Sequence, residues 1–164
     1  MNNEKGSVVL ICGKLCSGKS TYAQKLRQET NAVILSVDEI TLSLFNGDLG
    51  DKHDEMTEKV KKYLLEKSMQ ILEAGADVIL EWGFWTKQSR INTRSFYESR
   101  NISCQLHYVD ITDDIWQQNI SERNRKVLEG TVSAYYADDG LIEKFKGIFE
   151  MPDDDEINVR YQYC

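Results

Sequence analysis

Short apolar runs alternate with amphipathic segments along the chain. The apolar runs are rich in β-branched and aliphatic residues, which predicts buried strands at 7–12, 32–37, 77–81, 102–109 and 157–161. Helical spacing of the apolar residues predicts helices at 18–29, 54–74, 88–100, 113–128 and 138–150. Thr112 is expected to cap the helix that follows it, and Gly75 to end the helix at 54–74. Alternating strands and helices indicate a parallel sheet covered on both faces.

Three residues that are candidates for the functional site stand at the ends of predicted strands. Gly13, Asp38 and Glu81 each end or directly follow an apolar run. Parallel α/β sheets bind their ligands outside the carboxyl ends of the strands. We therefore expect these three positions to lie at one site.

A phosphate-binding loop follows the first predicted strand. The string Gly13-x-x-x-x-Gly18-Lys19-Ser20 matches the Walker A pattern, with a strand before it and a helix after it. Backbone N–H groups and the helix N-terminus would hold the phosphates, Lys19 would bridge the β- and γ-phosphates, and Ser20 would coordinate Mg²⁺. The predicted nucleotide-binding residues are Gly13, Lys14, Leu15, Cys16, Ser17, Gly18, Lys19, Ser20 and Thr21.

The nucleotide is expected to be ATP. A guanine reader usually carries Asn-Lys-x-Asp, and a switch GTPase also carries Asp-x-x-Gly after a strand; the sequence contains neither string. Asp38 lies close to the loop in a parallel sheet, so its carboxylate can accept a proton from a substrate hydroxyl. The alternative is that Asp38 caps the helix that follows it.

Length, charge and cysteine content narrow the class of protein. The chain has 164 residues, which predicts a single domain over 1–164, and its net charge of −7 disfavours nucleic acid as the main partner. No apolar run is long enough to span a membrane, and four cysteines without a C-x-x-C pair suit reduced thiols, so we expect a cytoplasmic protein, monomeric or dimeric. The four cysteines are Cys12, Cys16, Cys104 and Cys164.

Further strings resemble a family of small kinases. A strand at 78–81 ends in an acid and continues as Trp-Gly-Phe-Trp, Arg90 follows on the next helix, and Phe149-Glu150-x-Pro152-x-x-x-Glu156 stands near the end. Together with the phosphate loop, these strings resemble the AAA_33-type P-loop kinases, which are similar to chloramphenicol phosphotransferase, zeta toxins, gluconate kinase and polynucleotide kinase domains. The resemblance covers nearly the whole chain.

The resemblance implies both a fold and an activity. The fold would be a three-layer α/β sandwich with a five-stranded parallel sheet in the order 2-3-1-4-5 and a small helical lid at about 123–140. The activity would be ATP-dependent phosphorylation of a small-molecule hydroxyl, with Asp38 as base and Arg123 stabilising the transferring group. Arg123 also shares an inward helical face with Trp116 and Ile120, so it needs a negative partner, either a triphosphate or a carboxylate at the core edge.

The acceptor side is expected to follow the third strand. Trp82 and Trp85 would stack on a flat or sugar-like substrate, or else cover the sheet edge, and Arg90 would bind an anion or pack the adjacent helix. Glu81 would hold Mg²⁺, or else pair with a basic neighbour. Tyr135 and Tyr136 would gate the site from the lid or only pack there.

The sequence thus predicts a P-loop kinase that uses ATP and Mg²⁺ to phosphorylate a small molecule. Two other readings stay open. One is a nucleotide-binding module without transfer activity, and the other is an enzyme similar to polynucleotide 5′-kinases, which would need a basic channel.

Overall fold

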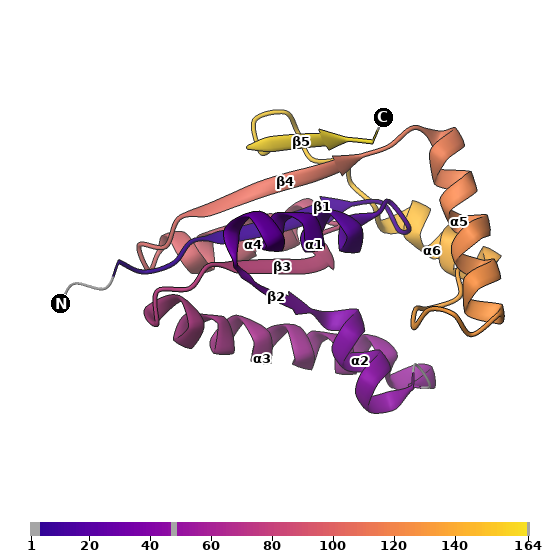
Figure 1. Ribbon diagram of the computed structural model, residues 1–164, viewed down its shortest axis with the longest axis horizontal. Helices are drawn as coiled ribbons and strands as arrows, with labels where there is room; N and C mark the ends of the chain where they lie inside the picture. The colour runs from indigo at the N-terminus through magenta and orange to yellow at the C-terminus, as the bar shows by residue number, and fades with distance from the viewer. Residues whose placement is uncertain (1–3, 47–48, 164) are drawn as a thin grey trace.

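One parallel sheet organises the chain. The computed structural model describes residues 4–46 and 49–163. Its strands run parallel in the order β2-β3-β1-β4-β5 (Figure 1), which confirms the order expected above. The strands are β1 (Val8–Gly13), β2 (Val33–Ser36), β3 (Val78–Gly83), β4 (Cys104–Asp110) and β5 (Val159–Gln162).

Helices cover both faces of the sheet, which gives the expected three layers. Helix α1 packs on one face, whereas α3 and α4 pack on the other (Figure 1). Helices α5 and α6 lie beyond the carboxyl ends of the strands, beside the loop that follows β1. The helices are α1 (Lys19–Thr30), α2 (Val37–Phe45), α3 (His53–Glu73), α4 (Lys87–Glu98), α5 (Asp113–Leu128) and α6 (Asp139–Ile148), with a short 3₁₀ turn at Gly50–Lys52.

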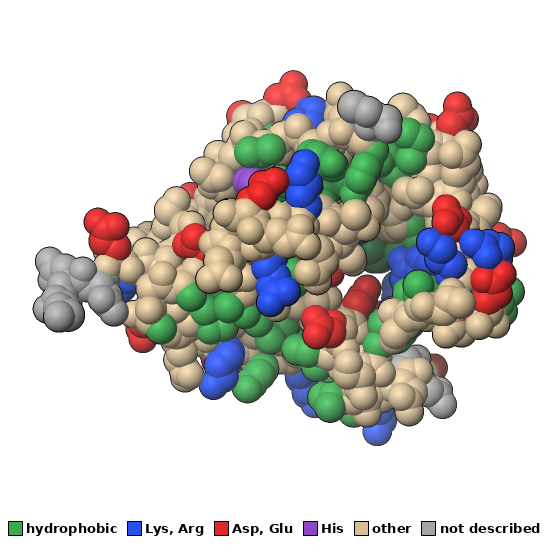
Figure 2. All heavy atoms as spheres, viewed as in Figure 1, with side chains coloured by type: hydrophobic (Ala, Val, Ile, Leu, Met, Phe, Trp, Pro, Cys, Tyr) green, Lys and Arg blue, Asp and Glu red, His purple; other side chains and the backbone are tan. Residues whose placement is uncertain are grey.

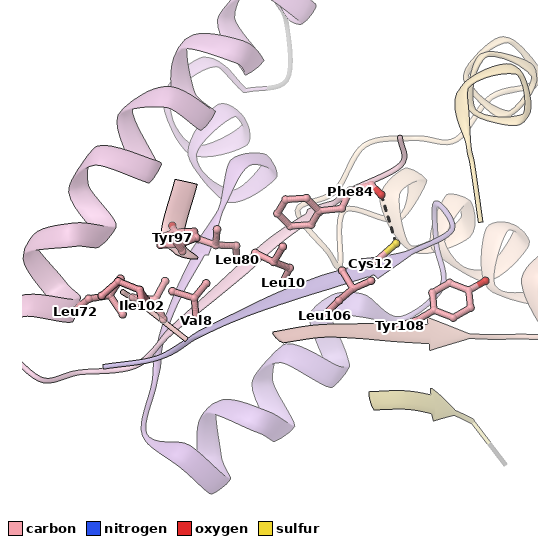
Figure 3. Close-up of a cluster of buried hydrophobic side chains, with 11 residues drawn as sticks. Val8, Leu10, Cys12, Leu72, Leu80, Phe84, Tyr97, Ile102, Leu106 and Tyr108 are labelled. Atoms are coloured by element: carbon pink, nitrogen blue, oxygen red, sulfur yellow. Dashed lines mark hydrogen bonds between the residues drawn. The ribbon is translucent and has the colours of Figure 1, made fainter. Parts of the chain in front are cut away.

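The core shows why β1 is central. Val8, Leu10 and Cys12 alternate along β1 and point into the cluster beneath α3 and α4, which Figure 3 shows. Ile11 points to the opposite face, against α1. Both faces of β1 are therefore dry, as a strand flanked by helices on each side requires. The Cys12 thiol donates to the carbonyl of Phe84 at 3.4 Å, which links β1 to the segment after β3.

The element boundaries differ from the predictions most clearly around Asp38. Strand β2 ends at Ser36, and α2 starts at Val37; the sequence pattern gave no bounds for this helix, although the cap alternative for Asp38 assumed one. Ser36 is its N-cap, because its hydroxyl accepts from the backbone N–H of Glu39 at 3.3 Å. The interpretation of Asp38 as a cap is therefore wrong. The caps at Thr112 and Gly75 are confirmed, the latter through its N–H bond to the carbonyl of Leu72.

Two further expectations can be compared with the described residues. No described helix has the length and apolarity needed to cross a bilayer. Cys12, Cys16 and Cys104 are free thiols, whereas the fourth cysteine, Cys164, lies outside the described residues.

A buried histidine joins β4 to α1. His107 is 6% exposed, and its Nδ1 lies 2.7 Å from the hydroxyl of Tyr22, while its Nε2 lies 3.2 Å from Oε1 of Gln105. Tyr22 also stacks on Tyr161 with ring centroids 4.6 Å apart, so the pair ties α1 to the far edge of the sheet. Burial lowers the pKa of His107 to about 4, because the apolar surroundings disfavour the imidazolium.

This histidine makes folding stability depend on pH. The folded pKa lies below the ordinary value, so the unfolded chain binds more protons between about pH 6.5 and pH 4. The contribution of His107 is present above that range and is lost as the pH falls through it. Urea titrations should show that His107→Phe loses less stability than the wild type between pH 7 and pH 4, by up to about 3 kcal/mol.

Tyr22→Phe serves as the control for this prediction. It removes the hydroxyl partner but leaves the imidazole buried, so it should keep the pH dependence of the wild type because burial is the main cause. Equal pH dependence in the wild type and in His107→Phe would contradict the prediction.

Candidate functional site

A large cleft opens at the carboxyl ends of the strands. Its volume is about 1830 Å³, and it extends from the loop after β1 to the helices α3 and α4. Figure 2 shows the hollow, with acidic and basic side chains gathered around its opening. Most of the predicted site residues line it: Leu15, Cys16, Ser17, Gly18, Lys19, Ser20, Thr21, Asp38, Glu81, Trp82, Trp85 and Arg123. Arg90, Gly13 and Lys14 are not among the lining residues.

The loop after β1 packs tightly around Gly13. A Cβ on Gly13 would lie 2.6 Å from the Ser17 hydroxyl and 3.0 Å from the carbonyl of Val109, so only glycine fits there. Gly18 has φ 87° and begins α1, where its left-handed conformation turns the chain into the helix. The buried Ser17 hydroxyl has no partner among the described residues. The loop therefore forms a concave end of the cleft at a helix N-terminus, which suits a phosphate group.

Lys19 carries the positive charge at the centre of the site. Its ammonium donates to the carbonyl of Lys14 at 2.6 Å, so the lysine folds back over the loop. Burial lowers the pKa of Lys19, and the carboxylates of Glu81 and Asp38 oppose that shift. The structure thus brings three residues from β3, α1 and α2 to one point of the cleft.

Glu81 and Ser20 present oxygen atoms beside this ammonium. Burial raises the pKa of Glu81, while the Lys19 ammonium and the facing hydroxyls of Ser36 and Ser20 oppose the rise. Ser36 is also the register neighbour of Glu81 in the β2–β3 pair. One carboxylate with hydroxyl oxygens, open to a phosphate chain, is a donor set that Mg²⁺ accepts. The residues therefore fit the expected metal.

Asp38 faces the same region from the first turn of α2. Its side chain is exposed and lines the cleft, and it lies close enough to Lys19 to act on that pKa. Glu39 also lines the cleft, although the sequence analysis gave it no role. With Ser36 capping the helix, the Asp38 carboxylate is free to meet a ligand.

Helix α5 supports the loop from the other side. The indole of Trp116 donates to the carbonyl of Leu15 at 2.6 Å, and the amide of Asn119 donates to the carbonyl of Cys16 at 3.0 Å. Arg123 donates from Nη1 to the Cys16 sulfur at 3.2 Å, and its buried Nε has no partner among the described residues. Among the described residues, Arg123 forms no ion pair with a carboxylate, which was one of its two expected partners. Its side chain lines the cleft instead.

The sequence analysis placed Trp116 on the inward face of this helix without a role in the loop, and it gave no role to Asn119. Both lie on the same face of α5 as Arg123, at helical spacing, and that spacing is the signal by which they could be found. Arg125 points elsewhere, because it pairs with Glu129 on the surface at 2.7 Å. It therefore does not join this support.

Trp82 and Trp85, which we expected on the acceptor side, both pack against neighbouring aromatic rings. Trp82 packs against Phe84 with centroids 5.2 Å apart, and Trp85 meets the edge of Phe145 at 5.0 Å. Both line the cleft as well, so each packs on a neighbouring ring and bounds the cavity. The buried Nε1 of Trp85 has no partner among the described residues. An indole N–H can only donate, so it is suited to an oxygen of a bound molecule.

Arg90 requires a correction. It is 3% exposed, its Nε pairs with Glu156 at 2.9 Å, and its Nη1 donates to the carbonyls of Phe84 and Glu150 at 3.0 and 2.9 Å. A guanidinium already bound to these internal acceptors does not meet an acceptor substrate. We therefore withdraw Arg90 from the substrate-binding residues. It joins the segment after β3 to the chain after α6. Its role is therefore one of packing, which was the alternative to binding an anion.

Several solved structures resemble this one over nearly all of the chain. Mycobacterium tuberculosis APS kinase CysC, in complex with AMPPNP and APS, aligns with a TM-score of 0.68 at 16% identity, covering 96% of this chain and 88% of that one. A gluconokinase from Sinorhizobium meliloti 1021 gives 0.62 at 12% identity, with 98% and 84% covered. Chaetomium thermophilum Kti12, in complex with ADP-AlF₃, gives 0.68 at 14%, with 95% and 88% covered.

These likenesses show that the fold is shared with P-loop kinases. No curated protein sequence matches the chain. The sequence profile of AAA_33, described as an AAA domain, matches residues 8–147, which include the phosphate loop, Asp38, Glu81 and the whole of α5. That match extends over most of the 164 residues. The chain therefore belongs to the AAA_33 family of AAA domains.

Proposed function

We propose that this protein is an ATP-dependent phosphotransferase that transfers the γ-phosphoryl group to a hydroxyl of a small molecule. The observation that carries the proposal is the meeting of Lys19, Asp38 and Glu81 in one cleft, from three different elements. A cation, a free carboxylate and an oxygen donor set are the parts that phosphoryl transfer needs around the transferring group.

Each residue has a step in the proposed reaction. Asp38 accepts the proton of the acceptor hydroxyl, whose oxygen forms a bond to the γ-phosphorus while the bond to the β-phosphate bridging oxygen breaks, releasing ADP. Lys19 exchanges its bond to the Lys14 carbonyl for phosphate oxygens, and Arg123 adds positive charge from α5. Ser20 and Glu81 would hold Mg²⁺, which would neutralise phosphate charge.

The charges at the cleft mouth favour a small acceptor over a polynucleotide. Three of the five lysines that line the cleft are paired with acids on their own or a facing helix. The pairs are Lys61 with Glu58 at 2.8 Å, Lys126 with Glu122 at 2.9 Å and Lys144 with Asp54 at 3.0 Å. A continuous basic track would instead leave such lysines available to phosphates. The tryptophans Trp82 and Trp85 supply flat apolar surfaces for the acceptor.

Asp38→Asn tests the proposed base. The variant keeps the side-chain volume but removes the proton acceptor, so transfer should fall by about 10²-fold or more while ATP binding persists. Lys19→Ala should instead weaken binding of ATP itself. The measurements are ADP release with a panel of hydroxyl compounds and calorimetric titration with a non-hydrolysable ATP analogue.

Glu66→Gln is the matched control for Asp38→Asn, because it neutralises an exposed carboxylate on α3 outside the cleft lining. It should leave transfer at the wild-type rate. Normal transfer by Asp38→Asn would remove that residue from the proposed role. Tight ATP binding by the wild type, without transfer to any compound of the panel, would favour a nucleotide-binding module.

Glu81→Gln tests the metal site. The amide keeps the shape of the side chain but loses its negative charge. The Mg²⁺ concentration needed for half-maximal thermal stabilisation should therefore rise by about tenfold. The effect measured is the thermal stabilisation that a non-hydrolysable ATP analogue gives at increasing Mg²⁺. The stabilisation measured in EDTA should not fall. An unchanged Mg²⁺ dependence would place the metal elsewhere.

A further inference from the structure

The segment between α5 and α6 crosses the cleft and is held at its α6 end. Val132, Ser133, Ala134 and Tyr135 line the cleft. Two residues further, Ala137 makes two hydrogen bonds to Asn124 of α5. The Asn124 side-chain amide donates to the Ala137 carbonyl at 2.8 Å, and its oxygen accepts from the Ala137 N–H at 2.7 Å. Asn124 directly follows Arg123, so the segment is attached to the helix that supports the phosphate loop.

The segment reaches the opposite wall of the cleft through the side chain of Tyr135. The Tyr135 hydroxyl lies 2.7 Å from the hydroxyl of Thr41 in α2, and its ring meets that of His53 edge-on at 5.4 Å. Nearby, Lys144 of α6 pairs with Asp54 of α3 at 3.0 Å. The two walls of the cleft therefore already touch, and Tyr135 makes the contact with α2.

The contact falls on a residue that determines how α2 sits. Helix α2 is short, and Val37 and Thr41 are its two buried residues. Thr41 is fully buried and its hydroxyl donates to the carbonyl of Asp38 at 3.2 Å. The hydrogen bonds thus run from Tyr135 to Thr41 and on to the backbone of Asp38. Removing one of them would allow the first turn of α2, which carries the Asp38 carboxylate, to shift.

We propose that Tyr135 is a positioning residue that holds α2, and with it Asp38, in place against the phosphate-binding half of the cleft. The proposal rests on the proposed function for its catalytic consequence, but the mechanical link is independent of it. Through Asn124 and Ala137, the same segment connects α2 to the helix that carries Arg123. Base and nucleotide would therefore be aligned by one continuous set of contacts. A small misplacement of a reacting group is enough to slow transfer strongly.

Two conservative variants remove the link from either side. Tyr135→Phe keeps the ring against His53 and loses only the hydroxyl, and Thr41→Val keeps the shape and loses the other hydroxyl. Each should lower kcat for transfer by about 3- to 10-fold, the equivalent of one hydrogen bond, and leave KM for ATP unchanged. The double variant should be no slower than the slower single variant, because both changes remove the same contact.

A second readout does not depend on transfer. Hydrogen exchange of the amides in α2 should become faster in Tyr135→Phe and in Thr41→Val, while exchange in α4 stays as in the wild type. Tyr136→Phe is the matched control: Tyr136 is 45% exposed, does not line the cleft, and its hydroxyl has no hydrogen bond among the described residues. It should change neither kcat nor exchange.

The two readouts separate the possible failures. Unchanged α2 exchange in Tyr135→Phe would overturn the proposed link, whatever the activity. Faster exchange with unchanged kcat would leave the link structural and overturn its role in positioning Asp38. If the wild type transfers phosphate to no acceptor while Tyr135→Phe still loosens α2, the proposed function fails and the link stands.

Discussion

A buried ammonium group is the constraint around which the site is arranged. Lys19 loses much of its hydration within the phosphate loop, and the structure compensates with the carbonyl of Lys14 and the carboxylates of Glu81 and Asp38. The carboxylates can stand there only because β3 lies next to β1 in the sheet and because α2 begins directly after β2. Strand order and charge compensation are therefore parts of the same requirement.

The two halves of the cleft are stabilised in different ways. The nucleotide half is held by hydrogen bonds from α5 to the loop backbone, at Leu15 and Cys16, where side-chain donors meet fixed carbonyls. The other half, where we propose that the acceptor binds, is held by aromatic packing around Trp82 and Trp85. Backbone contacts suit a ligand of constant shape, such as a triphosphate. Side-chain packing suits a surface on which the ligand chemistry can differ from one family member to another.

The sequence allowed prediction of the features that depend on local pattern. The phosphate loop and the inward placement of Arg123 follow from spacing, because each rests on residues close together in the chain. The strand order came instead from the resemblance to a known family. The bounds of helix α2 were missed because its nine residues are few and only Val37 and Thr41 are buried, which leaves little periodicity. The cap was assigned to Asp38 because Ser36 lay within the predicted strand, which the structure ends one residue earlier.

Contacts between distant segments lay beyond such reasoning. Arg90 was assigned to substrate because an arginine after a strand suggests an anion site, yet its partner Glu156 stands 66 positions away. Glu156 did belong to the tail pattern that carried the family resemblance, so a partner was visible but its position in space was not. The same holds for Tyr135 and Thr41, which are 94 positions apart.

The internal contacts of Arg90 have a consequence for how acceptors are recognised. They fix the turn that carries Trp85, and the N–H of Glu150 adds a bond to the Trp85 carbonyl at 2.7 Å. The conformational entropy of this turn is lost during folding, so a binding acceptor does not have to order it again. If the proposed function holds for this turn, it would act on the acceptor as a template with a fixed shape. Selectivity there would arise from exclusion of molecules that do not fit, more than from adaptation to those that do.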